Sequence, residues 1–378
     1  MDDSTEATLK ERRFAARRRA ERLLSGPRPQ TVRERLADLA TLADAPYDLD
    51  IPTDIYGDGL VRTLEQRVAA LLGKPDAAYF PTGTMAQQAA LQVWAAHRSD
   101  GRYSDSRTVA MHPLAHPEVH ERQAHARLSG LRTVWPTTAP RLPTAAELRS
   151  FDEPFHTLML ELPLREAGFV LPGWGELSEV YDVAEERSWR VHLDGARLWE
   201  SAHHFGRSLP EICERADSVY VSCYKTIGAH SGALVAGDEE FVREAKVWRH
   251  RYGGKLFQQW PAVLTALAGL DRELPRLDDC ITHAKTVADA LAEAPGARVN
   301  PDPPHTHQFQ LWLPHPAEAL DRAGVALAER DGIALFGAWR DAGPLPGLAM
   351  TEVTVAADAL DWTPKEITDA MAAFLELI

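Results

Sequence analysis

The sequence predicts an α/β protein with a large domain on a mostly parallel sheet and a small C-terminal α+β domain. From about residue 105 to 270, short apolar strands alternate with helical patterns, which is typical of a parallel sheet covered by helices. Two strands and three helices then follow in a shorter unit, which is of ordinary size for a small domain. We expect three parts: an N-terminal basic helical arm over 1–48, a large domain over 49–272 and a small domain over 273–378.

The individual elements follow from apolar spacing and from the positions of glycine and proline. Residues 1–45 favour helix, with a break at 25–29, where the chain reads Ser-Gly-Pro-Arg-Pro. Residues 60–73 have helical spacing and end on a glycine, and residues 77–96 are typical of strand, tight turn and helix in succession. Further strands are expected at Thr108–Met111, Thr157–Glu161, Val191–Asp194, Ser218–Cys223, 307–314 and 349–356, and further helices at 176–187, 282–294, 317–332 and 364–378.

Composition excludes several classes of protein. The chain has 378 residues, of which 45% are hydrophobic and 25% charged, so disorder of the whole chain is excluded. A formal net charge of −14 argues against nucleic acid as a general partner. The basic stretch at 11–24 is the exception, and we interpret it as a solvated or subunit-crossing arm rather than a nucleic-acid or membrane segment.

The chain also shows no sign of membrane insertion or secretion. No apolar run approaches the ~18 residues of a membrane span, and no apolar segment of a secretory signal follows the charged N-terminus. The three cysteines form no CxxC pair, which argues against a zinc ribbon or a disulfide framework. We therefore expect a cytoplasmic protein with reduced thiols.

Asp194 and Lys225 are the most informative pair of residues. Each stands at or just after the end of an apolar strand, and the carboxyl ends of parallel strands are where ligands bind in such sheets. A lysine beside an apolar strand is costly unless it is paired or used covalently. A structural ion pair is one interpretation. The other is that Lys225 forms a Schiff base with an aldehyde cofactor, while the carboxylate keeps a ring nitrogen protonated.

The turn at 81–85, Pro-Thr-Gly-Thr-Met, adds a third element. It lies between a strand and a helix, so its backbone N–H groups and the Thr84 hydroxyl face a helix N-terminus, as in a phosphate cradle. No GK[ST] follows, so it is not a Walker A loop, and by itself such a turn is usually a plain helix cap. Together with Asp194 and Lys225, it indicates pyridoxal phosphate as the cofactor.

Five segments resemble the threonine aldolase and β-eliminating lyase family of fold-type-I pyridoxal-phosphate enzymes. The resemblance runs from about residue 54 to 262, with a weaker tail to the C-terminus, and HLDGAR is its most specific motif. It implies an aspartate-aminotransferase-like fold, pyridoxal 5'-phosphate as cofactor, an amino-acid substrate, and a homodimer or homotetramer with sites between subunits. The segments are DIYGDG (54–59), FPTGTMAQQAAL (80–91), HLDGAR (192–197), YKTIGAHSGALVAG (224–237) and VWRHRYGGKLFQQW (247–260).

The resemblance also implies roles for individual residues. Lys225 would bind the cofactor aldehyde and Asp194 would pair with the pyridine nitrogen. Arg197 would lie near the substrate carboxylate or the cofactor. Gly83 and Thr84 would bind the cofactor phosphate, and Arg249 or Lys255 would reach it from the neighbouring subunit. His116 would stack on the cofactor ring, and Tyr56 would contact the substrate.

His116 stands in a cluster of four histidines that must be weighed as a metal site. The HExxH motif needs Glu directly after its first histidine, whereas Pro117 follows His116, so a zincin is excluded. We expect no metal and favour ring stacking by His116, with His120 as the alternative one helical turn later. The cluster comprises His112, His116, His120 and His125.

Three departures from the family concern the substrate. Nothing in residues 1–50 matches the family's L-R-S-D-T segment. The family's E-N-T-H-N stretch reads ELPLREAG at 161–168, which lacks the histidine and offers Arg165 and Glu166 as replacements. The strand at 348–355 lacks the arginine of the family's R-x-V-T-H, for which Arg340 and Arg165 are candidates.

We expect retro-aldol cleavage of a threonine-type β-hydroxy-α-amino acid to glycine and an aldehyde. The substrate would displace Lys225, and His116 or a water near it would remove the β-hydroxyl proton. Two alternatives stay open. One is other pyridoxal chemistry, such as β-elimination, racemisation or aldol-type synthesis. The other is a binding protein that kept the fold without catalysis.

Overall fold

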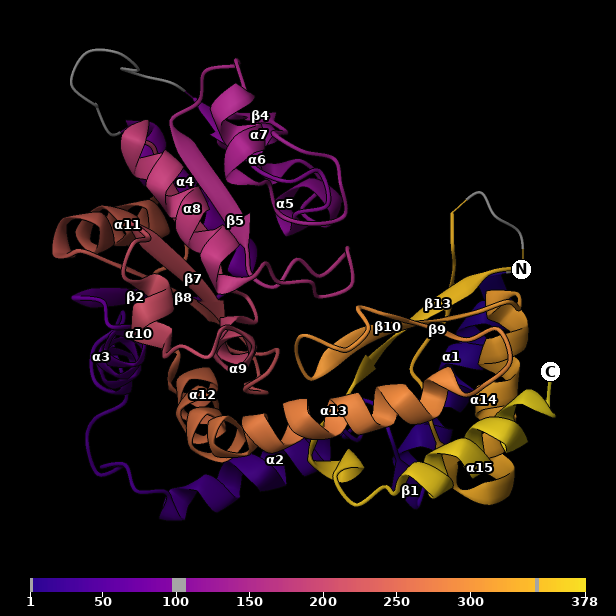
Figure 1. Cartoon of the computed structure of the whole chain (residues 1–378). Helices are drawn as coiled ribbons and strands as arrows, with labels where there is room; N and C mark the ends of the chain where they lie inside the picture. Colours follow the sequence, from indigo (N-terminus) through magenta and orange to yellow (C-terminus); the bar gives the residue numbers. More distant parts are fainter. Residues whose placement is uncertain (1–2, 97–106, 344–346) are drawn as a thin grey trace. The chain divides into compact units, whose positions relative to one another are not determined.

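The computed structural model describes residues 3–96, 107–343 and 347–378, which form two compact units (Figure 1). The large unit is Leu39–Pro275, and the small unit combines Met1–Asp38 with Arg276–Ile378. Within these ranges, no helix is both long and apolar enough to cross a membrane.

A seven-stranded sheet forms the centre of the large unit, in the order β2-β8-β7-β6-β5-β3-β4. Neighbouring strands from β4 to β7 run parallel, while β8 is antiparallel to both β2 and β7, so the predicted mostly parallel sheet is confirmed. β5, β7 and β8 are buried along their whole length, as expected for strands covered on both faces. The strands are β2 Asp76–Phe80, β3 Thr108–Ala110, β4 Arg132–Val134, β5 Thr157–Glu161, β6 Arg190–Asp194, β7 Ser218–Ser222 and β8 Ala233–Gly237.

The helices of the large unit pack through apolar stripes. In α3 (Leu60–Leu72), Leu64, Val68 and Leu72 recur every four residues and are fully buried. α3 ends at Gly73, where φ is +65° and an added Cβ would lie 2.7 Å from Pro210, so only glycine fits. The other helices are α4 Gly83–Ala96, α5 His116–Val119, α6 Ala124–Arg127, α7 Ala145–Ser150, α8 Trp174–Glu186, α9 Ser201–Phe205, α10 Leu209–Cys213, α11 Glu239–Arg251 and α12 Trp260–Glu273.

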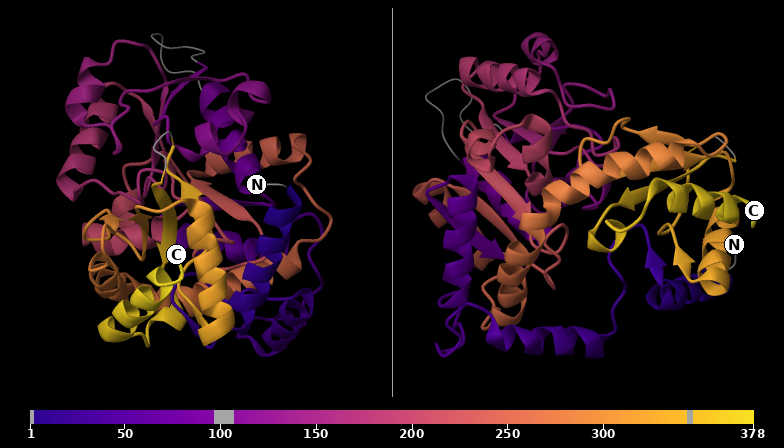
Figure 2. Two further views of the ribbon diagram at one scale, coloured as in Figure 1. Left: turned by 90° about the vertical axis from the view of Figure 1, so that its right-hand side faces the viewer. Right: turned by 60° about the horizontal axis from the view of Figure 1, so that its bottom comes forward.

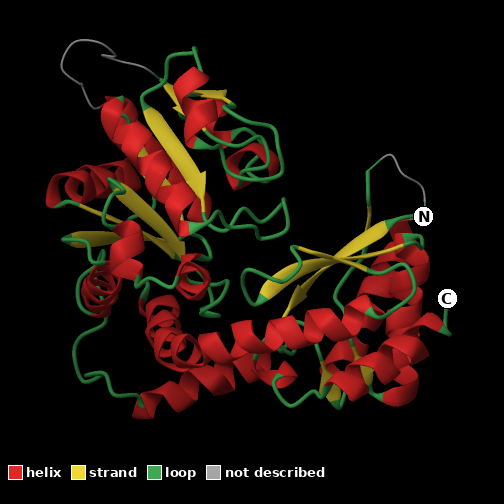
Figure 3. Cartoon of the chain, viewed as in Figure 1, coloured by secondary structure: helices red, strands yellow, loops and turns green. Residues whose placement is uncertain are grey.

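The small unit is built on an antiparallel sheet in the order β12-β13-β10-β9 (Figure 3). Phe309, Leu311 and Leu313 alternate along β10 and are completely buried, which places one face of this sheet in the core. Besides its strands β9 Arg298–Asn300, β10 Gln308–Leu313, β11 Ile333–Ala334, β12 Arg340–Asp341 and β13 Ala349–Thr354, the unit contains α13 Leu277–Ala292, α14 Ala317–Asp331 and α15 Pro364–Leu375.

The N-terminal segment, predicted as a basic helical arm over 1–48, begins with a helix that packs on another helix of the small unit. α1 (Asp3–Arg19) packs on α14, with Arg12 and Arg13 each 2.7 Å from a carboxylate of that helix, Glu329 and Asp321. β1 (Arg22–Leu23) then pairs in parallel with β11. Figure 2 shows this indigo segment beside the orange and yellow C-terminal elements. The basic stretch is therefore part of the small unit's fold, and α2 (Val32–Thr41) follows it.

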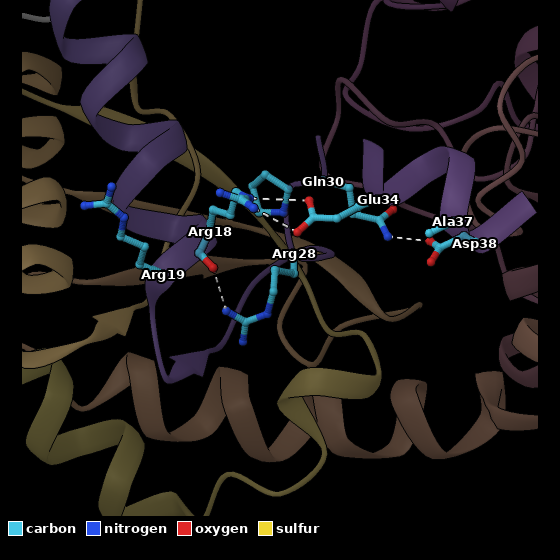
Figure 4. Close-up of a pocket in the computed structure, with 8 residues that line it drawn as sticks. Arg18, Arg19, Arg28, Gln30, Glu34, Ala37 and Asp38 are labelled. Carbon is cyan, nitrogen blue, oxygen red and sulfur yellow. Dashed lines mark hydrogen bonds and ion pairs between the residues drawn. The ribbon is translucent and has the colours of Figure 1, made fainter. Parts of the chain in front are cut away.

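A surface pocket of about 450 Å³ in the small unit shows how other arginines of this stretch are used (Figure 4). Arg18 Nη2 lies 2.9 Å from Glu34 Oε1, and Arg28 Nη1 donates to the carbonyl oxygen of Ala20 at 2.5 Å. The contact between Arg18 and Glu34 joins the two sides of the break at 25–29, and Arg28 links the break itself to Ala20. The pocket contains none of the predicted site residues.

Candidate active site

Three neighbouring strands of the large unit end in polar residues at one edge of the sheet. Glu161 at the end of β5 is paired in register with Asp194 at the end of β6, and Lys225 follows three residues after β7. Gly195 permits the turn after β6, because a Cβ there would lie 2.7 Å from the carbonyl oxygen of Tyr220. The parallel arrangement thus brings Asp194 and Lys225, predicted from strand ends, into one group.

The environment of Lys225 increases the neutral fraction of its amine. Burial is the largest cause, and the positive charge of Arg197 adds to it, so the pKa of Lys225 falls from 10.5 to about 8. Asp194 and Glu161 oppose this shift by favouring the ammonium form. A lysine that is partly neutral near physiological pH is suited to nucleophilic attack on a carbonyl.

The two carboxylates beside Lys225 are themselves perturbed by burial. Burial raises the pKa of Asp194, and the charges of Lys225 and His116 partly offset that effect. Burial and the neighbouring Asp194 raise the pKa of Glu161 to about 7, so it can hold a proton at neutral pH. Asp194 Oδ1 also accepts a hydrogen bond from the Ala196 N–H at 3.2 Å, which orients it.

His116 begins the short helix α5 and is held beside the same group. Its backbone N–H donates to Glu161 Oε2 at 2.7 Å, and its Nδ1 lies 3.5 Å from Glu121 Oε1. The other oxygen of the buried Glu121 accepts from Gln88 Nε2 at 3.2 Å. His116 is near enough to Asp194 for its charge to lower that residue's pKa, as a role beside the reacting group requires.

The predicted phosphate turn lies at the N-terminus of α4. Among the described residues, the backbone N–H groups of Gly83 and Thr84 have no hydrogen-bond acceptor, as is usual for the first turn of a helix. A Cβ on Gly83 would collide with the hydroxyl of Tyr220 and lie 3.6 Å from that of Tyr224. Glycine therefore lets two tyrosine hydroxyls approach the end of the helix.

Gln87, one turn further along α4, connects this turn to β6. Its Oε1 lies 2.8 Å from Nε2 of the buried His192, whose Nδ1 lies 2.8 Å from Ser218 Oγ. Burial lowers the pKa of His192 to about 3, so the ring is neutral and can donate to Gln87. Gln87 Nε2 is buried with no partner among the described residues. An orphaned donor, free N–H groups and a reactive lysine fit a cofactor that carries a phosphate and an aldehyde.

Arg197 is supported by the loop that follows β5. Its guanidinium lies 5.3 Å from the centre of the Phe169 ring, a cation–π distance. Phe169 is fully buried with a φ of +60°, a conformation that non-glycine residues rarely adopt. The strained Phe169 thus provides a platform for Arg197 beside Lys225.

The described contacts of the Tyr56 side chain do not include Asp194, Lys225 or His116, and its substrate role stays a prediction. Tyr56 is 49% exposed, and its described contacts are with Phe257, at 5.6 Å between ring centres, and with Lys255. Asp54 from the same motif instead caps α12, because its carboxylate accepts the N–H groups of Gln259 and Trp260 at 2.8–3.0 Å.

The sequence predicts that Arg249 or Lys255 contacts the phosphate of the neighbouring subunit. The buried guanidinium of Arg249 donates to the carbonyl oxygen of Tyr79 at 2.6 Å and lies 3.5 Å from Glu65 Oε1. Both contacts lie within the same chain, and the phosphate role of Arg249 or Lys255 stays a prediction.

The four clustered histidines do not meet at one point, although the ring centres of His116 and His120 are 5.2 Å apart. His112 contacts the carbonyl oxygen of Ala139 at 2.7 Å, and His120 contacts Glu166 at 2.9 Å. Over the described ranges, no group of three or more His, Cys, Asp or Glu side chains could hold a metal ion.

Comparison with known proteins identifies the family. The model of the β-eliminating lyase family matches residues 43–312, which is more than half of the chain. The chain belongs to the β-eliminating lyase family. The family resemblance predicted from the motifs is thereby confirmed.

Several known proteins are similar to this chain over 57–98% of its length. A proposed L-allo-threonine aldolase from Listeria monocytogenes EGD-E has 30% identity and a TM-score of 0.88, covering 98% of this chain and 100% of that one. The low-specificity L-threonine aldolase of Candida albicans is 29% identical over 67% of this chain and 66% of its own length, slightly less than two thirds. An alanine racemase of Cochliobolus carbonum is 30% identical over 57% of this chain and 55% of its own. The fold is that of fold-type-I enzymes, as predicted.

Two residues of the candidate site, Tyr220 and Glu121, are not among those predicted from the sequence. Tyr220 lies on β7 beside Asp194 and approaches the first turn of α4, and Glu121 contacts His116. Alternation along β7 could have suggested Tyr220, because it shares a face with Ser222 at the strand end. No local pattern marks Glu121, whose role depends on its contacts with His116 and Gln88.

Proposed function

We propose that this protein binds pyridoxal phosphate and cleaves threonine-type β-hydroxy-α-amino acids to glycine and an aldehyde. The observation that carries the proposal is Lys225, whose pKa of about 8 and position beside Asp194 suit attachment of an aldehyde cofactor. The names of the relatives from Listeria and Candida support the choice of substrate.

The residues would hold the cofactor by three contacts. The N–H groups of Gly83 and Thr84 at the start of α4 would bind the phosphate, and Lys225 would supply the amine for the aldehyde. Asp194 would accept a hydrogen bond from the protonated ring nitrogen. When bound, pyridoxal phosphate accepts the electron pair released by a bond to the substrate's α-carbon.

Proton transfer falls to His116 in this proposal. Its Nδ1 lies 3.5 Å from Glu121 Oε1, and in this proposal Nε2 accepts the proton of the substrate's β-hydroxyl group. Glu161 fixes the start of α5 through the backbone N–H of His116. In this proposal the carboxylates of Glu121 and Glu161 position His116 and take no part in the proton transfer.

Absorption spectroscopy with product analysis tests the function. We expect the protein reconstituted with pyridoxal phosphate to show a visible band that changes with glycine, and to release acetaldehyde from L-threonine or L-allo-threonine. Lys225→Ala should abolish the band and turnover, and an active Lys225→Ala protein would refute the role of this lysine.

A second candidate reaction is racemisation, which the similarity to the alanine racemase favours. The same reconstituted protein distinguishes the two reactions. Racemisation converts L-alanine to D-alanine and releases no aldehyde, whereas cleavage of threonine yields acetaldehyde and glycine.

We further propose a cytoplasmic homodimer or homotetramer. All three cysteines are free and buried, which suits a reducing compartment.

The oligomer is supported by large apolar side chains that are 44–58% exposed on two neighbouring segments, as expected of a surface that a second copy covers. They are Ile55, Tyr56, Leu256 and Phe257. Light scattering on the native protein and on Phe257→Asp tests this, because the substitution should shift the native assembly toward monomer.

A further inference from the structure

Tyr220 lies in the middle of the large sheet, on β7 and outside the five segments that resemble the family. It pairs in register with Asp194 of β6 on one side and with Val235 of β8 on the other. Its carbonyl oxygen also accepts the Gly195 N–H at 2.8 Å. The backbone of Tyr220 is therefore fixed from both sides, so its side chain starts from a rigid position.

The side chain of Tyr220 reaches from the sheet to the start of α4. It belongs to a buried apolar cluster that includes Phe80 and Ala86, and only 3% of the residue is exposed. A Cβ on Gly83 would collide with the Tyr220 hydroxyl oxygen. The hydroxyl group therefore lies directly against the first residue of the helix.

The hydroxyl of Tyr220 has no hydrogen-bond partner among the residues that the structure describes. Burial raises its pKa well above 10, and the charge of Asp194 adds to this effect, so the group keeps its proton and can donate. A buried donor without an acceptor costs free energy unless a ligand supplies one. The burial and position of this hydroxyl thus indicate a ligand at the start of α4.

Two more donors without acceptors lie at the same place. They are the N–H groups of Gly83 and Thr84, whereas the next N–H, that of Met85, donates to Thr82 Oγ1 at 3.3 Å. A water molecule would bring two further protons to these three donors, but an anion with several oxygens accepts from all of them. The partial positive charge of a helix N-terminus also favours an anion there.

The charges around the start of α4 make directional donors necessary. The carboxylates of Asp194 and Glu121 are near enough for their charges to act on Tyr220, and they disfavour an anion. Arg197 opposes them, because its positive charge acts on Tyr224, whose hydroxyl is 3.6 Å from the same Cβ position on Gly83. Neutral donors such as the Tyr220 hydroxyl can hold an anion where the nearby charges partly cancel.

We propose that the hydroxyl of Tyr220 binds the phosphate of pyridoxal phosphate, as a third donor beside the N–H groups of Gly83 and Thr84. This inference rests on the proposed function, because it presumes that cofactor. It makes Tyr220 a determinant of cofactor affinity. It also gives a reason for glycine at position 83, because a larger residue would displace the hydroxyl group.

Binding of pyridoxal phosphate and of pyridoxal to the cofactor-free protein tests the proposal. The two compounds share the ring and the aldehyde, but only the first carries the phosphate. Affinities are measured from the visible band and by equilibrium dialysis. For Tyr220→Phe, which keeps the ring in its cluster, we expect pyridoxal phosphate to bind roughly 10- to 100-fold more weakly, with pyridoxal little changed. Inorganic phosphate should also compete less well for this variant than for the unmodified protein.

Tyr181→Phe is the matched control, because Tyr181 is also buried and its hydroxyl donates to the carbonyl oxygen of Ile212 at 3.0 Å, outside the site. It should keep the ratio of the two affinities found for the unmodified protein. If Tyr220→Phe keeps that ratio as well, the role of Tyr220 is overturned, while a visible band that still requires Lys225 leaves the proposed function intact. If the unmodified protein forms no visible band with either compound, both fail.

Discussion

The amine of Lys225 should react with pyridoxal phosphate at a pH well below that needed by an ordinary lysine. Burial and the charge of Arg197 lower its pKa to about 8 from 10.5. At pH 7, roughly a tenth of the amine is then neutral, against about three in ten thousand for an unperturbed lysine. Because only the neutral amine attacks the aldehyde, we expect an initial rate about 300-fold higher at equal intrinsic nucleophilicity.

The assay follows the visible band when cofactor-free protein is mixed with pyridoxal phosphate between pH 6 and 10.5. The folded protein lowers the pKa, so the reactive form should accumulate as pH rises through about 8 and the rate should level off above it. N-acetyl-lysine amide is the unperturbed reference, and Lys225→Ala gives the background. A half-maximal rate above pH 10 would refute the electrostatic reasoning.

Two variants test the causes separately. Arg197→Gln removes a positive charge that disfavours the ammonium, so the midpoint should move to higher pH. Glu161→Gln removes a negative charge that favours the ammonium, so the midpoint should move to lower pH. Shifts in the same direction would show that disruption of the site, rather than charge, causes them.

Two further substitutions should affect cofactor binding and stability. Gly83→Ala places a Cβ against the hydroxyl of Tyr220 on β7, so we expect the affinity for pyridoxal phosphate to fall about tenfold. Gly175→Ala is the control, because nothing lies within 4 Å of its added Cβ, and the affinity should not change. Glu65→Gln leaves the buried Arg249 without its carboxylate, so urea unfolding should show that the free energy of unfolding falls by about 3 kcal/mol. The exposed Glu244→Gln is the control and should change the free energy of unfolding little.

Much of the candidate site could be predicted because its residues stand at ends of regular elements. Asp194 and Lys225 terminate apolar strand patterns, and Gly83 begins a helix after a strand, so local periodicity locates all three. Parallel topology then requires that the ends of β6 and β7 meet at one edge of the sheet.

Residues whose role depends on neighbours from other strands and loops could not be predicted in this way. The sequence marks Glu161 only as part of a departure from the family, yet register pairing places it beside Asp194, and it holds both His116 and Arg165. Its pKa of about 7 arises from burial and that neighbour, neither of which its own segment of sequence encodes.

The same distinction explains the N-terminal segment. Its composition correctly indicates helix, but a two-residue strand such as β1 has no periodicity to detect. Its pairing with β11 joins residues more than 300 positions apart, Arg22 with Ile333. The family, the order of the helices and strands, and the candidate reactive residues can be recognised from the sequence, because they depend on local pattern. The carboxylates, arginines and histidines that surround Lys225 become evident only after folding, because contacts between distant segments set burial and charge.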